Sequence, residues 1–81
     1  MRIVVQLFAA ARELVGSSQA VVNLPRASTV ADLRRALTAQ HPELAPLLQH
    51  ALFAVDADYA DDQTSLNPDV DVACIPPVSG G

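Results

Sequence analysis

The sequence predicts an α+β domain in which a mixed sheet of four to five strands has its helices packed on one face. Two kinds of pattern lead to this prediction. Segments that alternate apolar and polar residues stand near both ends of the chain, and such alternation is typical of half-buried strands. Between them lies a longer segment whose apolar residues recur at helical spacing. The 81 residues suffice for one small domain with a single core.

The first third of the chain predicts a strand, a short helix and a second strand. Residues 2–8 alternate and are rich in β-branched side chains, and residues 9–15 are rich in alanine. Gly16 follows at the point where a helix end favours a residue with positive φ. Residues 19–24 alternate again, and Pro25 ends that strand.

The clearest helix is predicted to begin after Thr29. The Thr29 hydroxyl can cap the helix, and Asp32 stands where a capping box places its acidic partner. The core stripe consists of Val30, Leu33, Ala36 and Leu37. Arg34, Arg35 and Gln40 are expected to face water. The helix should stop at His41, because a residue before proline is pushed out of the helical region.

The second half of the chain predicts more strands. Residues 43–49 can add one helical turn, residues 52–56 form a strand, and residues 57–65 form an acidic polar stretch that contains Tyr59. A turn over 67–69 then leads into a last strand over residues 70–75. This element order is that of a β-grasp fold, with the first and last strands expected as neighbours at the centre of the sheet.

The chain divides into a β-grasp domain, residues 1–75, and a flexible C-terminal tail, residues 76–81, that ends in Gly-Gly. Pro76 and Pro77 should end the last strand and stiffen the exit, because proline cannot donate to a strand ladder. The four residues that follow can reach about 13–14 Å. Glycine has no Cβ, so Gly80 and Gly81 can enter a channel too narrow for side chains.

Composition excludes several classes of function. The net charge is −4, with five arginines and no lysine, whereas nucleic-acid binding needs a basic stripe. No apolar run reaches the roughly 20 residues of a membrane span. The single cysteine, Cys74, cannot form an internal disulfide, which suits a reducing compartment. We expect a cytoplasmic protein that binds neither nucleic acid nor membrane.

Several motifs together resemble one family. Phe8-Ala9, the Arg-Glu-Leu-Val-Gly run over 12–16, Val55-Asp56 before Tyr59, and the Pro-Pro-Val-Ser-Gly-Gly ending are similar to the small, sulfur-carrier subunit of molybdopterin synthase, a ubiquitin-like protein. The resemblance spans the whole chain. It departs at Asp56, where the family often has asparagine, and at Cys74 and Ile75, where the family often has two aromatic residues.

The resemblance implies chemistry at the C-terminus. Gly81 would be adenylated by a ubiquitin-activating-type enzyme that uses ATP, and then converted into a thiocarboxylate. Inserted with Gly80 into the large subunit of the synthase, it would donate sulfur to cyclic pyranopterin monophosphate. The catalytic pocket would lie in the large subunit, in an assembly of two small and two large subunits. No cofactor or metal is expected to bind this chain.

A partner surface is expected beside the tail. If Ile3, Val5 and Leu7 face the helices, Phe8 faces the other way, and Val70, Val72 and Cys74 facing inward would turn Ile75 outward. The residues predicted to bind partners are Phe8, Tyr59, Ile75, Pro76, Pro77, Val78 and Ser79. The opposing interpretation is that these are scattered apolar residues on an open sheet face.

Other candidate sites are weaker. The aspartates over 56–62 resemble a calcium loop but lack its glycine and its final glutamate, so a solvated hairpin loop is favoured. His41 and His50 have no cysteine near them, and Cys74 is expected to be a small buried apolar residue. Three other functions stay open: a sulfur carrier for thiamine or tRNA thiolation, a conjugating ubiquitin-like modifier, and a β-grasp binding module without covalent chemistry.

Overall fold

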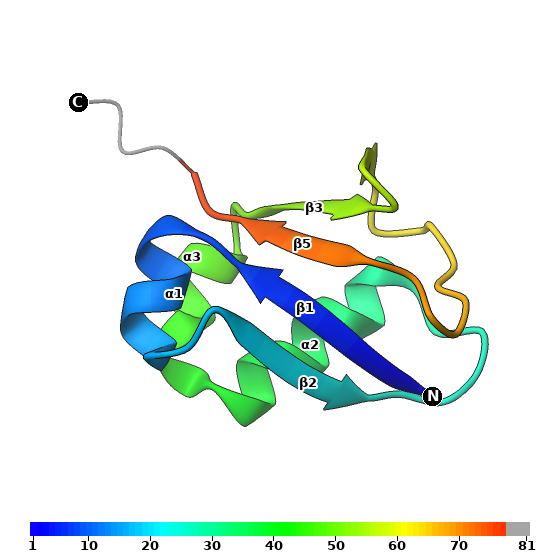
Figure 1. Cartoon of the computed structure of the whole chain (residues 1–81), viewed down its shortest axis with the longest axis horizontal. Coiled ribbons are helices and arrows are strands. Elements are labelled where there is room, and N and C mark those ends of the chain that lie inside the picture. Colours follow the sequence, from blue (N-terminus) through cyan, green and yellow to red (C-terminus); the bar gives the residue numbers. More distant parts are fainter. Residues whose placement is uncertain (78–81) are drawn as a thin grey trace.

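The computed structural model describes residues 1–77, which form one sheet with helices against it (Figure 1). The strands are β1 (Arg2–Leu7), β2 (Gln19–Asn23), β3 (Leu52–Val55), β4 (Asp58–Ala60) and β5 (Val72–Ile75). The helices are α1 (Ala9–Val15), α2 (Val30–Gln40) and α3 (Ala45–Leu48), with a 3-10 turn, η1 (Pro42–Leu44), before α3. The predicted β-grasp arrangement is confirmed.

The first and last strands lie side by side inside the sheet, as predicted. The strand order is β2-β1-β5-β3-β4, and β1 and β5 run parallel while every other pair is antiparallel. Leu7 pairs with Cys74 on one side of β5, and Phe53 pairs with Cys74 on the other. The strand that leads to the C-terminus is therefore bonded along both edges.

The core lies between the sheet and the helices. In Figure 1, α2 and α3 lie behind the sheet, so the face in front carries no helix. Alternate residues of β1 and β5 point inward, together with one stripe of α2, as their sequence periods predict. The largest fully buried side chains include Ile3, Val5, Val22, Val30, Leu33, Leu37, Leu44, Leu48, Phe53, Leu66 and Val72.

The predicted end of α1 at Gly16 and the predicted start of α2 after Thr29 are both confirmed. Gly16 ends α1 with a φ of 79°, and its N–H donates to the carbonyl of Arg12 at 2.8 Å. At the start of α2, the Thr29 N–H donates to Asp32 Oδ2 at 2.9 Å, and the Asp32 N–H donates to Thr29 Oγ1 at 3.3 Å. The bond from the Thr29 backbone lowers the pKa of Asp32.

A hairpin forms at the acidic stretch over 57–65, as predicted, and part of this stretch is a strand that the sequence analysis did not place. Asp58–Ala60 form β4, which pairs with β3 through a two-residue turn at Asp56 and Ala57. Both turn residues have positive φ, 50° and 70°, as in a type I′ hairpin turn. The usual sequence of that turn is Asn-Gly or Asp-Gly. Because this chain has alanine in place of the glycine, the sequence analysis did not predict the turn. Asp56 Oδ1 also accepts from the N–H of Asp71 at 3.0 Å.

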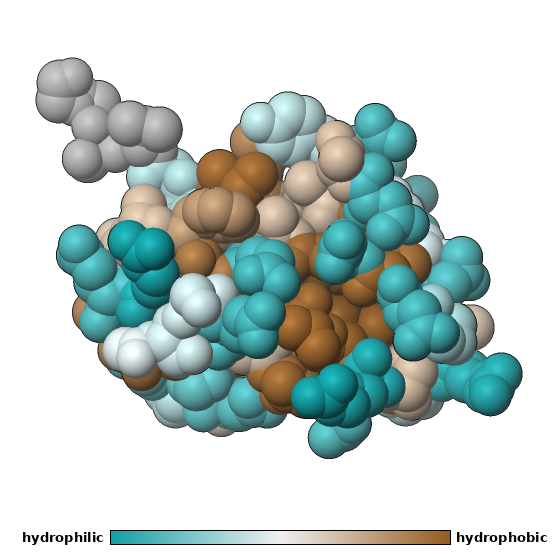
Figure 2. All heavy atoms as spheres, in the orientation of Figure 1, coloured by the Kyte–Doolittle hydropathy of each residue, from teal (hydrophilic) through white to brown (hydrophobic). Residues whose placement is uncertain are grey.

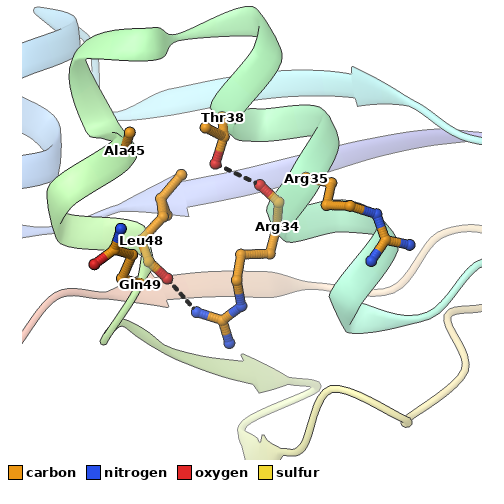
Figure 3. A pocket seen from close by; sticks show the side chains of 6 residues that line it. All are labelled: Arg34, Arg35, Thr38, Ala45, Leu48 and Gln49. Atoms are coloured by element: carbon orange, nitrogen blue, oxygen red, sulfur yellow. Dashed lines mark hydrogen bonds between the residues drawn. The ribbon is translucent and has the colours of Figure 1, made fainter.

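Arg34 does not face water, contrary to the prediction. Its guanidinium donates to the carbonyl oxygens of Leu48 and Ala51, the latter at 2.9 Å, and to Asp62 Oδ1 at 2.8 Å. It also lies over the Phe53 ring, 5.0 Å from the centroid. Figure 3 shows the side chain reaching from α2 toward the end of α3. Arg34 therefore ties three segments together, which periodicity within α2 alone cannot reveal.

Arg35 and Gln40, which were also predicted to face water, are both exposed. Arg35 is exposed and pairs with Asp32 on the same helix. Gln40 is exposed too, but its Nε2 donates to the carbonyl oxygen of Val21 at 2.9 Å. That carbonyl belongs to β2, which is an outer strand of the sheet, so Gln40 covers part of an open edge.

Replacing Arg34 with methionine should destabilise the domain by about 2–3 kcal/mol, because the buried carbonyls of Leu48 and Ala51 lose a charged donor. Urea unfolding monitored by circular dichroism measures this change. Arg35→Met removes the same charge from the same helix and should cost about 0.5 kcal/mol or less. Equal losses in the two variants would contradict the clamp role of Arg34.

Replacing Ala57 with glycine should stabilise the domain by about 0.5–1 kcal/mol. Glycine relieves the cost of a left-handed backbone at residue 57, and this gain exceeds the entropy that glycine adds to the unfolded chain. Thermal unfolding tests the sign. The matched control is Ala39→Gly in α2, which is exposed and helical and should lose about 1 kcal/mol. A lower melting temperature for Ala57→Gly would exclude the turn assignment.

Candidate functional site

The candidate site is the end of β5, from which the chain continues toward Gly81. Ile75 ends the strand, Pro76 is buried and Pro77 is exposed. Burial of Pro76 means that this residue packs with the domain and does not offer its side chain to a partner. Val78, Ser79, Gly80 and Gly81 lie outside the described residues.

The face of the sheet that carries no helix presents rows of side chains across the strands. Cys74 and Phe53 are fully buried on the helix side, so their neighbours Ile75 and Leu52, which pair with each other, point to the open side. A second row runs from β1 to β4 through Gln6, Ala73, Ala54 and Tyr59. Figure 2 shows apolar residues gathered over β1 and beside the last described residues, with polar residues around the margin.

Three residues of the predicted partner surface, Phe8, Tyr59 and Ile75, lie at this face or its edge. Phe8 is 49% exposed and Tyr59 is 73% exposed, whereas Ile75 is half-buried. Phe8 directly follows β1, and because Leu7 pairs with Cys74, it leaves the sheet at the same end as Ile75. Tyr59 stands on β4, two strands away from β5. We call Phe8, Leu52, Tyr59 and Ile75 the exit patch.

Leu52 is the member of the exit patch that the sequence reasoning missed. Leu52 is 55% exposed, and its Cα pairs with that of Ile75. The alternation in β3 was sufficient to predict that Leu52 is exposed, because a buried Phe53 turns Leu52 outward. The pairing with Ile75, however, follows from the order of strands in the sheet and is not written in β3 itself.

A shallow hollow of about 290 Å³ opens on the same face. It is lined by Gln6, Ala54, Ala57, Asp71, Val72 and Ala73. Two alanines side by side, paired between β3 and β5, leave the space that larger residues would fill. The open face thus combines protruding apolar side chains with a recess, as expected of a surface that packs against another protein.

A second hollow lies on the helix side and has no part in the candidate site. It has a volume of about 270 Å³ and is lined by Arg34, Arg35, Thr38, Ala45, Leu48 and Gln49 (Figure 3). The Arg34 guanidinium is already bonded to carbonyl oxygens, and Thr38 Oγ1 donates to the carbonyl of Arg34 at 2.8 Å. Arg34 and Thr38 therefore serve the fold.

Cys74 is buried, as predicted. It lies in β5 between Leu7 and Phe53, and its side chain has no solvent exposure. Burial raises the pKa of its thiol to about 11. The thiol therefore stays protonated at neutral pH and is a poor nucleophile.

The aspartates of the acidic stretch make hydrogen bonds that stabilise the fold. Asp61 Oδ1 accepts from the N–H of Gln63 at 2.9 Å and from the Thr64 hydroxyl at 3.2 Å, while Asp62 holds Arg34. Across residues 1–77, no three His, Cys, Asp or Glu side chains gather as metal ligands would. Within the same range, no helix has both the length and the apolar character needed to cross a bilayer.

Comparison of sequences finds close relatives over nearly the full length. The profile of the ThiS family matches residues 5–81. A molybdopterin synthase sulfur carrier subunit from Dictyostelium discoideum is 36% identical over 78 residues, which cover 93% of this chain and 91% of the relative. Another from Chlamydomonas reinhardtii is 34% identical, and the alignment covers all of both chains.

Comparison of structures finds the same fold in solved proteins. The crystal structure of SAMP1 from Haloferax volcanii matches with a TM-score of 0.87 and 27% identity, over all of both chains. A chain from the complex of subunits 1 and 2 of molybdopterin-converting factor from Helicobacter pylori 26695 matches with a TM-score of 0.69 and 21% identity, and also aligns in full. At that identity, the second likeness concerns the fold.

Proposed function

The chain belongs to the ThiS family, and from that premise we propose that it is the sulfur-carrier subunit of a molybdopterin synthase. The relatives named above carry that function in their names and align almost from end to end. The observation that carries the proposal is the position of β5. This strand is bonded on both edges and ends beside an exposed apolar patch, so it can present a C-terminal segment to a docked partner.

The proposed reaction takes place at the carboxylate of Gly81. A carboxylate is a poor electrophile until one of its oxygens becomes part of a leaving group. A ubiquitin-activating-type enzyme would use ATP to form the Gly81 acyl-adenylate and release pyrophosphate. Sulfur from a donor would then attack the carbonyl carbon, and AMP would leave with the electron pair of the broken C–O bond. The product is a C-terminal thiocarboxylate.

The loaded carrier would then deliver its sulfur inside the large subunit. The thiocarboxylate would attack cyclic pyranopterin monophosphate, and two loaded carriers act for each product because a dithiolene contains two sulfurs. Gly80 and Gly81 bring no side chain into the channel. The domain itself supplies no catalytic group in this scheme, which agrees with the buried thiol of Cys74. The catalytic pocket is assigned to the large subunit.

The exit patch is proposed as the main contact with the large subunit. It contains two exposed aromatic residues, Phe8 and Tyr59, a class enriched at protein interfaces. Pro77, Val78 and Ser79 would line the passage into the partner, whereas Pro76 stays in the domain. We assign the complex to the cytoplasm, with two small and two large subunits.

A second candidate function is a conjugating ubiquitin-like modifier. It is favoured by the match to SAMP1, a small archaeal modifier protein, which covers all of both chains. The same activation of Gly81 would serve it, with a lysine amine in place of sulfur as acceptor. Sulfur carriers for thiamine or tRNA thiolation share the chemistry as well. A binding module without covalent chemistry would not need Gly81.

Incubation with the activating enzyme, ATP and a sulfur donor should exchange one oxygen of the C-terminus for sulfur. Intact-mass spectrometry measures the change, and fragmentation should place it at Gly81. The chain without Gly81 should gain no sulfur and support no product. An unchanged mass for the full chain, or full activity of the shortened chain, would exclude the proposed function.

Replacing Leu52 with aspartate should weaken binding to the large subunit by on the order of tenfold, because a charge would be buried at the centre of the interface. Isothermal titration calorimetry measures the affinity, and circular dichroism checks that the domain is folded. Leu14→Asp is the control, since Leu14 is 49% exposed but lies on α1 and not on the sheet. Equal losses of affinity in the two variants would show that Leu52 is not part of the interface.

A further inference from the structure

We propose that this carrier is inert toward its own activated C-terminus: no side chain among its 81 residues offers an amine or thiol that can take the acyl group of Gly81, and the Met1 amine is beyond reach within the same copy. The activated carbonyl is thereby reserved for an acceptor on another protein. This inference rests on the proposed activation of Gly81. It adds a statement about which acceptors the chain permits, and it predicts that copies of the chain do not acylate one another's side chains.

Side-chain amines are missing from the sequence. All five basic residues are arginines, and there is no lysine. A lysine amine attacks an acyl-adenylate readily once it loses its proton. Nitrogen then bonds to the carbonyl carbon, the C–O bond to AMP breaks, and the amine proton passes to solvent. An arginine guanidinium keeps its proton in proteins and does not attack in this way. The basic side chains of this protein therefore carry positive charge but cannot compete with the intended acceptor for the activated carbonyl of Gly81.

The one amine in these 81 residues, on Met1, lies at the opposite end of the sheet from the end of β5. It donates to the carbonyl of Leu24, and the Leu24 N–H donates back to the Met1 carbonyl at 2.9 Å. Because β1 and β5 are parallel and Leu7 pairs with Cys74, Met1 and Ile75 lie at opposite ends of the sheet (Figure 1). The distance from Met1 to Leu7 along the strand is about 20 Å, whereas the four residues after Pro77 span at most about 14 Å. Cyclisation is therefore out of reach.

The one thiol is enclosed. Cys74 is fully buried in β5, with Leu7 and Phe53 as its strand neighbours on either side. Burial raises the pKa of the thiol to about 11, which keeps the nucleophilic thiolate scarce at neutral pH. An acyl-adenylate on one copy therefore cannot pass to the cysteine of another unless the sheet opens. The same geometry protects Cys74 from the sulfur donor.

The consequence differs between the two candidate functions. For a sulfur carrier, the adenylate persists until sulfur arrives and is not consumed by other copies. For a modifier, each acceptor lysine would receive a single copy, because a second copy would find no lysine on the first. Chains of this protein linked through lysine cannot form in either case.

The experiment restores lysine without changing charge. Arg12→Lys in α1 and Arg26→Lys before α2 each introduce one amine at an exposed position. Wild type and both variants are incubated at high concentration with the activating enzyme and ATP, without a sulfur donor. Hydroxylamine added to a parallel sample traps the adenylate as a hydroxamate and reports activation. Denaturing electrophoresis under reducing conditions and intact mass report covalent products.

We expect wild type to form the hydroxamate but no dimer linked through a side chain. The lysine variants should accumulate a reductant-resistant dimer, with the mass of two chains less one water and an isopeptide bond at the new lysine. A wild-type dimer linked through a side chain, a cyclised chain or a thioester at Cys74 would overturn the proposal. It would equally fall if both variants formed hydroxamate but no dimer. Absence of hydroxamate in all three proteins would instead overturn the activation of Gly81, and with it this inference.

Discussion

The parallel pairing of β1 with β5 is the constraint on which the other features depend. Antiparallel neighbours can be joined by a tight turn, whereas a parallel pair needs a crossover connection, and here the whole chain between the two strands supplies it. The pairing fixes the direction of β5, so its end lies beside Phe8 and at the far end of the sheet from Met1. It also encloses Cys74 in the centre. The place where β5 ends, the patch next to it and the separation of that end from Met1 follow from this one register.

The second half of the domain is held by polar contacts in addition to apolar packing. Arg34 binds two carbonyl oxygens and Asp62, and the N–H groups of Val30 and Ala31 at the start of α2 donate to the carbonyls of Thr64 and Asp62, each at 3.0 Å. These bonds fasten the segment after β4 to the helix. A domain of 81 residues has little apolar surface to bury, and satisfied polar groups of this kind fix the positions of β3 and β4. The open face of the sheet thereby keeps its rows of side chains in register.

The proposed chemistry needs little from the side chains of this protein. Activation, sulfur delivery and transfer all involve a backbone carbonyl, and the catalytic groups are assigned to partners. What the domain contributes is a fixed exit, a docking surface and a lack of competing nucleophiles. A sulfur carrier and a protein modifier would both need the fixed exit and the docking surface, which is a physical reason why one fold can serve both. They diverge in the acceptor, which lies outside this chain.

Local patterns in the sequence determined the helices, the caps and most strands, because periodicity, a capping box and Gly16 each act within a few residues. The Pro-Pro-Val-Ser-Gly-Gly ending and the Arg-Glu-Leu-Val-Gly run together pointed to the sulfur carriers, because the chemistry resides in the terminal residues themselves. Three features needed the tertiary structure. The β3–β4 turn was hidden because Ala57 adopts a conformation that usually marks glycine. Arg34 was assigned to solvent because its partners are distant in sequence. Leu52 joined the exit patch only through its pairing with Ile75, since contacts between strands are set by the order of the sheet and not by either strand alone.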